Sequence, residues 1–287
     1  MKRSLLEEVG ILLLKNGFTV KTLTRTCFDI LARKDSSILL VKILHDANSI
    51  SRETAGEMER VSYYISASPL VIAERAGSYL EDNMVYERFG ICTLTPSTFK
   101  NCFENKSPFL RRSHAGPTAS VIGEKLKQKR DELGYSLNEL SRNVGVSRRM
   151  MSKYESGNSE ASLKNANALY RLFGGSIFRK IDIFSPQGKV ADSLSEIPKK
   201  YNELGFESTE TKKAPFDIIA KKEKSIILTE IGDNTNPYLL SVSKLIDAER
   251  LVIFRKKKPK EIPALTKKEF LEFESANELI KFLKEFE

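Results

Sequence analysis

Few residues that could perform metal or covalent chemistry are present in this sequence, and their spacing is irregular. The three cysteines, Cys27, Cys92 and Cys102, are odd in number and lack the paired spacing of zinc ligands. The histidines are two in number, His45 and His114. These counts argue against a disulfide scaffold, a zinc ribbon and a histidine-rich metal site. We therefore expect a protein of a reducing compartment that carries no metal and no cofactor.

Charge is the more informative chemical property of the chain. The 287 residues carry 47 Lys and Arg against 38 Asp and Glu, a formal net charge of +9. A basic balance favours polyanionic partners, of which nucleic acid is the commonest. Residues 119–175 carry 10 basic and 6 acidic side chains, which makes them the most basic part of the chain per residue. We therefore expect the nucleic-acid contact in this middle segment.

Length and hydropathy predict a soluble protein of two to three domains, at roughly 150 residues for each domain. No apolar run approaches the ~20 residues that a membrane span requires. Glu7 and Glu8 interrupt the apolar stretch near the N-terminus, where a signal peptide needs a continuous one. We expect a cytoplasmic protein.

The middle segment has the pattern of short helices separated by glycines. Ser136, with Glu139 three residues later, has the spacing of a capping box that begins a helix. Gly145 follows where a sharp turn needs a positive φ, Ser147 can cap the next helix, and Gly157 can end it. Two short helices joined in this way form a helix-turn-helix. The side chains expected in its core are Ile122, Leu126, Leu133, Leu137, Leu140, Val144, Val146, Leu163, Ala166, Leu169, Tyr170 and Leu172.

This segment resembles the Cro/C1-type family of helix-turn-helix DNA-binding domains over about 55 residues. Two departures are mild, because Ser141 stands where alanine is usual and Leu137 stands where a glutamine often contacts phosphate. The residues that carry the resemblance are Ser136, Leu140, Ser141, Gly145, Val146, Ser147, Met151, Ser152, Glu155 and Gly157.

The resemblance implies that residues 147–156 form a recognition helix, which enters the major groove by its N-terminal end. Arg148 and Arg149 are the first exposed side chains there, and an arginine can donate two parallel hydrogen bonds to guanine O6 and N7. Ser152 and Lys153 lie one turn further on, towards base edges or phosphates. Ser136 and Asn138, at the start of the preceding helix, are candidates for phosphate contacts. The full set of predicted DNA-binding residues is Ser136, Asn138, Ser147, Arg148, Arg149, Ser152 and Lys153.

Each of these residues also has a purely structural interpretation. Either arginine alone can be a solvated surface side chain, and Lys153 suits a phosphate better than a base. Glu155 is expected to form an intramolecular tie, because phosphates repel a carboxylate. Met151 and Tyr154 are expected in the core.

The two ends of the chain repeat each other. FDILARKDSSILLVKI, from Phe28 to Ile43, returns 188 positions later as FDIIAKKEKSIILTEI, from Phe216 to Ile231. Two further blocks follow in the same order in each copy, which indicates duplication. Each copy is predicted to be α/β. The expected elements are an opening helix around residues 5–13, strands at 28–33, 38–44 and 70–74 and a helix at 51–65, then strands at 216–221, 226–231 and 251–254 and a helix at 236–248.

The element order of each copy resembles the restriction-endonuclease-like fold. Active members of that fold place an Asp, and then an acid-x-Lys triplet in the next strand, around Mg²⁺. In the first copy Asp29 and Lys42 match this pattern, but Leu40 holds the acid position. In the second copy Asp217 matches, Leu228 holds the acid position and Glu230 replaces the lysine.

A leucine cannot coordinate Mg²⁺, so both copies are interpreted as inactive relatives of the fold. The favoured interpretation of Asp29 and Asp217 is that they are hairpin residues with structural partners. The alternative is a partial nuclease site that combines Glu7 or Glu8 with Asp29 and Lys42.

The predicted organisation is a multidomain α/β plus all-α protein: residues 1–112 as the first α/β copy, 113–184 as a linker and helix-turn-helix domain, and 185–287 as the second α/β copy. This layout resembles a family of archaeal transcriptional regulators. The resemblance implies a regulator that binds double-stranded DNA sequence-specifically and is not an enzyme.

A homodimer is expected, because one short recognition helix reads only a few base pairs. The flanking copies would then serve dimerisation or contacts with partners and effectors. One alternative is a coactivator that bridges to the transcription machinery without operator specificity, and a second is a metal-dependent nuclease.

Overall fold

The computed structural model describes residues 2–113, 116–188, 195–259 and 262–285. Contacts divide the chain into one unit of Met1–Ile72, Phe89–Ile91 and Ile183–Glu287, and another of Ala73–Arg88 and Cys92–Asp182. These units cut across the segments 1–112, 113–184 and 185–287, which stay a prediction. In the described part of the chain, none of the helices is long and apolar enough to cross a membrane.

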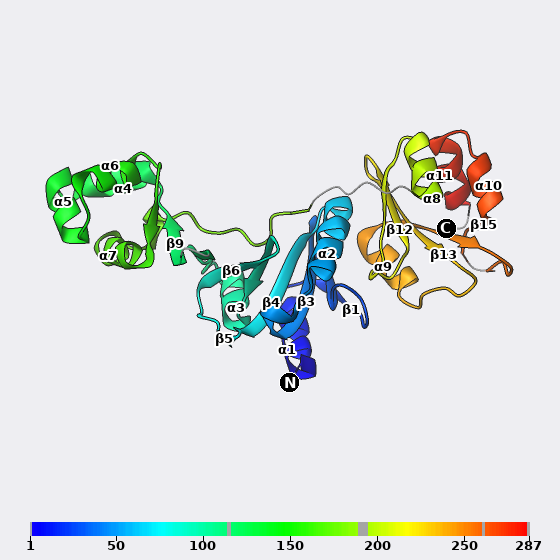
Figure 1. Cartoon of the computed structure of the whole chain (residues 1–287), viewed down its shortest axis with the longest axis horizontal. Coiled ribbons are helices and arrows are strands. Elements are labelled where there is room, and N and C mark those ends of the chain that lie inside the picture. Colours follow the sequence, from blue (N-terminus) through cyan, green and yellow to red (C-terminus); the bar gives the residue numbers. More distant parts are fainter. Residues whose placement is uncertain (1, 114–115, 189–194, 260–261, 286–287) are drawn as a thin grey trace. The chain divides into compact units, whose positions relative to one another are not determined.

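The N-terminal part of the first unit has the predicted helix–hairpin–helix–strand order (Figure 1). An antiparallel sheet joins β1 to β2 and β2 to β3, and β4 lies next to β3 in the sheet order. The Ser51 hydroxyl caps α2 by accepting a hydrogen bond from Thr54 N. The elements are α1 (Lys2–Lys15), β1 (Thr19–Thr22), β2 (Ile30–Lys34), β3 (Ser37–Asp46), η1 (Ala47–Ser49), α2 (Arg52–Ile65) and β4 (Ser68–Ala76).

The C-terminal part of this unit repeats the same order. Its sheet runs β11-β12-β13-β14-β15, with β13, β14 and β15 mutually parallel. Both copies contain a short edge strand, β1 or β11, that the sequence analysis missed. The elements are α8 (Glu196–Glu203), β11 (Glu207–Glu210), β12 (Ile218–Lys222), β13 (Ser225–Ile231), α9 (Leu239–Ile246), β14 (Glu249–Phe254), β15 (Ala264–Thr266), α10 (Lys267–Glu272) and α11 (Ala276–Lys284).

The two hairpins share one register, which confirms that the copies are related. Thr19 pairs with Arg33 in the first copy, and Glu207 pairs with Lys221 in the second. Both members of the second pair lie 188 positions after their counterparts, as do the members of every other pair in these strands. A slip of one residue would turn the buried face of a strand towards solvent, so this agreement reflects the same pattern of buried side chains.

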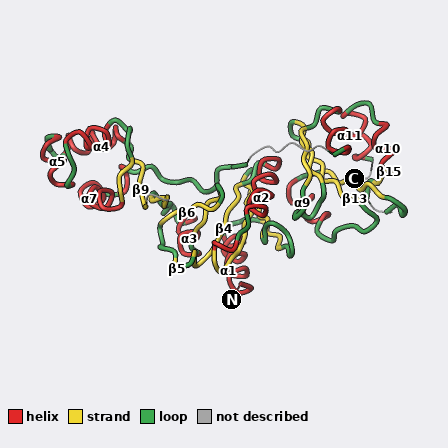
Figure 2. The backbone as a smooth tube through the Cα atoms, in the orientation of Figure 1, coloured by secondary structure: helices red, strands yellow, loops and turns green. Residues whose placement is uncertain are grey.

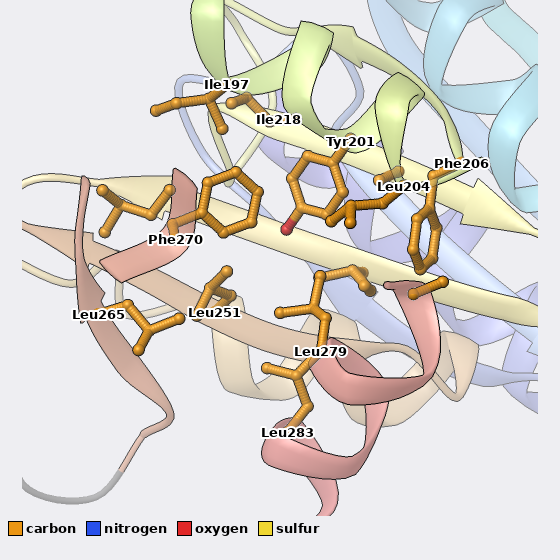
Figure 3. Packing of buried hydrophobic residues seen from close by; sticks show 14 residues of the cluster. Ile197, Tyr201, Leu204, Phe206, Ile218, Leu251, Leu265, Phe270, Leu279 and Leu283 are labelled. Carbon is orange, nitrogen blue, oxygen red and sulfur yellow. The ribbon is translucent and has the colours of Figure 1, made fainter. Parts of the chain in front are cut away.

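The core of the second copy lies between its sheet and the helices α8, α10 and α11 (Figure 3). Tyr201, Phe206 and Phe270 provide its aromatic part, and the Tyr201 hydroxyl lies 2.7 Å from the buried Thr229 hydroxyl. This hydrogen bond satisfies a polar group that would otherwise be costly to bury. Burial raises the pKa of Tyr201. The remaining core members include Ile197, Leu204, Ile218, Leu251, Leu265, Leu279 and Leu283.

Residues 108–117 lack apolar periodicity and are expected from the sequence to form a linker, but most of them lie in strands. Leu110–Ser113 form β8 and Gly116–Ser120 form β9, which pair as an antiparallel hairpin, while residues 114 and 115 lie outside the described residues. The stretch lacks apolar periodicity because its strands are short and, among their described side chains, mostly half-buried. β9 also pairs with β10 (Glu160–Ser162), and β8 pairs with β6 (Met84–Arg88). The second unit also contains β5 (Ser78–Tyr79), β7 (Ile91–Leu94) and α3 (Pro96–Phe103), as well as the helices of the middle segment.

Candidate nucleic-acid interface

The middle segment folds into four helices beside β9 (Figure 2). They are α4 (Gly123–Glu132), α5 (Leu137–Val144), α6 (Arg148–Glu155) and α7 (Leu163–Phe173), followed by η2 (Gly175–Ile177). Helices α5 and α6 are the two members of the predicted helix-turn-helix. Their order and lengths confirm the prediction from the glycine and capping pattern.

The capping box at the start of α5 has formed as its spacing predicts. Glu139 N donates to the Ser136 hydroxyl at 3.2 Å, and Ser136 N donates to Glu139 Oε2 at 2.8 Å. These hydrogen bonds also lower the pKa of Glu139, so the carboxylate is charged at neutral pH. Two of the backbone donors at this end of α5 are thereby satisfied.

A tight turn joins α5 to α6. Gly145 adopts φ 77°, a left-handed conformation that glycine accepts without a steric cost. Val146 N donates to Ser141 O at 2.9 Å, which closes the end of α5. The Ser147 hydroxyl then accepts from Met150 N at 3.2 Å and begins α6. The turn therefore sets the angle at which α6 leaves α5.

The inner face of α6 packs into the core of the middle segment. Met151 and Tyr154 are fully buried, as predicted, together with Leu140. The Tyr154 hydroxyl accepts a hydrogen bond from Asn165 Nδ2 on α7 at 3.0 Å. The further members of this core are Ala119, Val121, Leu126, Val144, Ala161, Ala166, Leu169, Phe173, Ile177 and Phe178.

Four side chains predicted for this core lie outside it: Ile122 and Leu163 are half-buried and do not join the cluster, and Leu133 and Tyr170 are exposed. Leu133 is 56% exposed, because α4 ends at Glu132 and Leu133 follows as its C-cap. Tyr170 is 49% exposed, and its ring stacks on Phe109, which in turn stacks on Phe178. The helical periodicity could not reveal this outer aromatic stack, because Phe109 comes from the segment before β8.

The C-terminal end of α6 is tied to α4 by an ion pair. Arg130 Nε lies 2.6 Å from Glu155 Oε1, and its Nη2 lies 3.3 Å from Oε2. Both side chains are only 12% exposed. The hydrogen bonds to Glu155 raise the pKa of Arg130, and the same guanidinium donates to Tyr135 O at 3.0 Å. Glu155 is therefore the predicted intramolecular tie, and the missed partner is Arg130.

The same end of α6 lies against the backbone of α4. A Cβ atom added at Gly123 would lie 2.1 Å from Glu155 O and 3.0 Å from Tyr154 O. Only a glycine permits this approach, because real Cβ atoms do not come so close to a carbonyl oxygen. Nothing in the sequence pattern distinguishes Gly123 from a glycine in a turn, so its packing role could not be predicted.

The outer face of α6 carries the predicted contact residues. Arg148, Arg149, Ser152 and Lys153 are all exposed, and within the described residues none of the three cations has a carboxylate within ion-pair distance. Asn138 is exposed on α5. Ser136 and Ser147 are exposed caps whose oxygens accept backbone hydrogen bonds, so each retains only its hydroxyl proton for a phosphate.

The charge at the start of α6 is opposite to the one that stabilises a helix. Helices α4 and α5 place Glu124 and Glu139 in their first turns, as the helix dipole favours. Helix α6 has no acidic residue there and carries Arg148 and Arg149 instead. Cations at this end cost a few tenths of a kcal/mol or more in an isolated helix. An external anion bound at this end would offset that cost.

The α/β copies do not present the residues that a Mg²⁺ site of the restriction-endonuclease-like fold requires. Leu40 and Leu228, at the acid positions, are fully buried. Asp29 Oδ2 accepts from Ile43 N at 2.8 Å, and its Oδ1 lies 3.3 Å from Lys42 Nζ. Asp29 therefore has structural partners, as the favoured interpretation expected.

The second copy makes the same hairpin contact. Asp217 Oδ2 accepts from Ile231 N at 2.6 Å. Glu230 Oε1 accepts from Asn236 N at 2.6 Å, and burial and then nearby Asp217 raise the pKa of Glu230. Among the described residues, no three His, Cys, Asp or Glu gather as a metal site would need. The donor set does not fit a Mg²⁺ ion in either copy.

The close approach at Gly123 yields a prediction about stability. We expect Gly123→Ala to separate α4 from the end of α6 and to cost about 1–3 kcal/mol, because an overpacked backbone contact cannot relax by moving a side chain. Hydrogen exchange of the α6 amides measures this cost. Gly10→Ala is the control: no atom lies within 4 Å of its added Cβ, and alanine in α1 is expected to be neutral or stabilising. Unchanged α6 protection in Gly123→Ala would contradict the packing described.

Comparisons with known proteins agree with this architecture. Residues 2–108 match the PD-(D/E)XK superfamily domain, and residues 126–178 match the helix-turn-helix domain. A Methanocaldococcus jannaschii protein named "Putative HTH-type transcriptional regulatory protein" is 30% identical over 99% of this chain and 97% of its own length. Proteins of the same description from Archaeoglobus fulgidus and Methanosarcina acetivorans are each 31% identical over 99% of this chain, and the matches span 98% and 97% of those proteins. The chain therefore belongs to this archaeal family of HTH-type transcriptional regulatory proteins.

Proposed function

We propose that this protein regulates transcription by reading a double-stranded DNA sequence with α6. The observation that carries the proposal is the pair Arg148 and Arg149, which are exposed at the positive end of α6 without an acidic neighbour in its first turn. A helix N-terminus that enters the major groove brings such side chains to guanine O6 and N7. The names of the relatives, which describe transcriptional regulators, support the same role.

The other exposed residues of the helix-turn-helix take supporting roles. Lys153, one turn beyond the arginines, contacts a phosphate or a base edge together with Ser152. At the start of α5, Ser136 and Asn138 contact phosphate. The charged Glu139 lies beside them, so this contact depends on the Ser136 hydroxyl and the Asn138 amide more than on the helix dipole.

Two copies of α6 would read paired half-sites. A single short helix contacts few base pairs, and a homodimer that places two such helices ~34–36 Å apart reads one face of the duplex over successive turns. We propose that the α/β copies support this assembly or bind partners and effectors. The symmetry of the bound DNA sequence shows whether a two-fold symmetric dimer reads it.

Selection from a random duplex library at ~150 mM salt tests the reading of sequence, because bare electrostatic binding is weak there. We expect an enriched motif with guanines. Arg148→Ala combined with Arg149→Ala should lose about 5- to 150-fold in affinity for it per bidentate contact removed, which corresponds to ~1–3 kcal/mol each. Arg171→Ala is the matched control, because Arg171 is an exposed arginine in the last turn of α7.

Lys153→Ala separates phosphate contacts from base contacts. It should weaken binding to all sequences alike and reduce the salt slope by about 1. No enrichment by the folded wild-type protein would contradict the proposal and favour a coactivator that bridges to the transcription machinery.

We further propose that the α/β copies do not hydrolyse DNA. The buried leucines Leu40 and Leu228 and the hydrogen bonds of Asp29 support this proposal. With Mg²⁺ or Mn²⁺ added, we expect the wild-type protein and Asp29→Ala to leave supercoiled plasmid equally intact. Cleavage by the wild-type protein that Asp29→Ala abolishes would establish a nuclease instead.

A further inference from the structure

Residues of the two α/β copies correspond by two constant offsets. The hairpin residues of the second copy lie 188 positions after those of the first, as Arg33 and Lys221 illustrate. The offset after the long helix is 181 positions: α2 ends at Ser66 with φ 53°, and α9 ends at Asp247 with φ 52°. These offsets identify which contacts between the copies are equivalent.

The first pair of equivalent contacts joins a hairpin to the end of a long helix. Arg33 Nη1 lies 2.5 Å from Asp247 Oδ2. Lys221 Nζ donates to the Ser66 hydroxyl at 3.1 Å. By these offsets, Arg33 corresponds to Lys221 and Ser66 corresponds to Asp247. Each copy therefore provides the hairpin residue of one contact and the helix-end residue of the other.

The second pair has the same reciprocal form. Glu57 Oε2 on α2 accepts from Lys212 N at 3.1 Å. The Tyr238 hydroxyl, beside α9, lies 3.1 Å from the Thr24 hydroxyl. Glu57 corresponds to Tyr238 and Lys212 corresponds to Thr24 by the two offsets. At the level of whole elements, α2 contacts β12 while α9 contacts β2.

Several contacts between the copies have no counterpart, and for one of them the chemical reason is plain. Cys27 N donates to Lys213 O at 2.6 Å. The position equivalent to Cys27 is Pro215, which has no N–H to donate. The two pairs of reciprocal contacts are therefore related by two-fold symmetry, whereas this backbone bond and the ion pair of Lys213 Nζ with Glu53 Oε2, at 2.8 Å, depart from it.

Reciprocal contacts of this kind define an isologous interface, in which the same patch of each partner is used twice. We propose that the two α/β copies of one chain are each other's binding partner. Each presents its long helix and hairpin to the other, and the chain carries an intramolecular pseudo-dimer. A second chain does not occupy these faces, because the tethered copy reaches them first. Any homodimer of the whole protein uses a different surface.

Cross-linking of the full-length chain tests this proposal. The native Cys27, Cys92 and Cys102 are buried, and burial raises the pKa of Cys27 to about 12 and of Cys102 to about 11, which keeps these thiols unreactive. Ser66→Cys is combined with Lys221→Cys, and separately Arg33→Cys with Asp247→Cys. A short bismaleimide is added to the folded protein, and the products are resolved by mass.

We expect both pairs to give an adduct within one chain, at the mass of the monomer. The control combines Ser66→Cys with Lys268→Cys, whose native side chain is 89% exposed on α10, a helix that packs on β14 and β15 of its own copy. Adducts between two chains, at twice the mass of the monomer, would overturn the proposal. They would indicate that the α/β copies are swapped between two chains. A yield no higher than the control for both pairs, in variants with native circular dichroism, would overturn it as well.

Discussion

The ion pair between Arg130 and Glu155 determines how α6 is presented. It joins the last turn of α4 to the last turn of α6 with two hydrogen bonds between largely buried side chains. A largely buried carboxylate without this partner would carry a desolvation cost. The pair also neutralises the charge of Glu155, which lies at the opposite end of α6 from Arg148 and Arg149. The Gly123 contact holds the same end by backbone packing, and the N-terminal end of α6 is left free for a ligand.

The α/β copies have kept the hairpin geometry of a nuclease fold and use its carboxylates for structure. Asp29 and Asp217 both accept a hydrogen bond from the backbone N–H of the residue 14 positions later, so the two copies close their hairpins in the same way. Glu230, which replaces the lysine in the second copy, is buried where its charged form is disfavoured. The reciprocal contacts between the copies suit the assembly role that we propose for them.

Much of this fold could be predicted from local signals. The strongest of these signals are the capping residues Ser136 and Ser147 and the turn at Gly145. Each is strong because the structure requires a side-chain oxygen or a positive φ at that single position. The duplicated hairpins were evident from letter-by-letter repetition. The strands β8 and β9 were missed because their side chains show no alternation of buried and exposed positions, and because their outer partners, β6 and β10, are distant in the sequence. Arg130 and Gly123 were missed for a related reason: each acts through a partner about 25 to 32 positions away.

The most direct test of the central claim is methylation of guanine N7 in the selected DNA site. We expect the wild-type protein to protect guanines in the major groove, and we expect this protection to disappear when Arg148→Ala and Arg149→Ala are combined while the variant remains bound at lower salt. Guanines that stay equally protected in the double variant, or an absence of guanine protection at a site that the wild-type protein occupies, would contradict the claim that these two arginines read the bases.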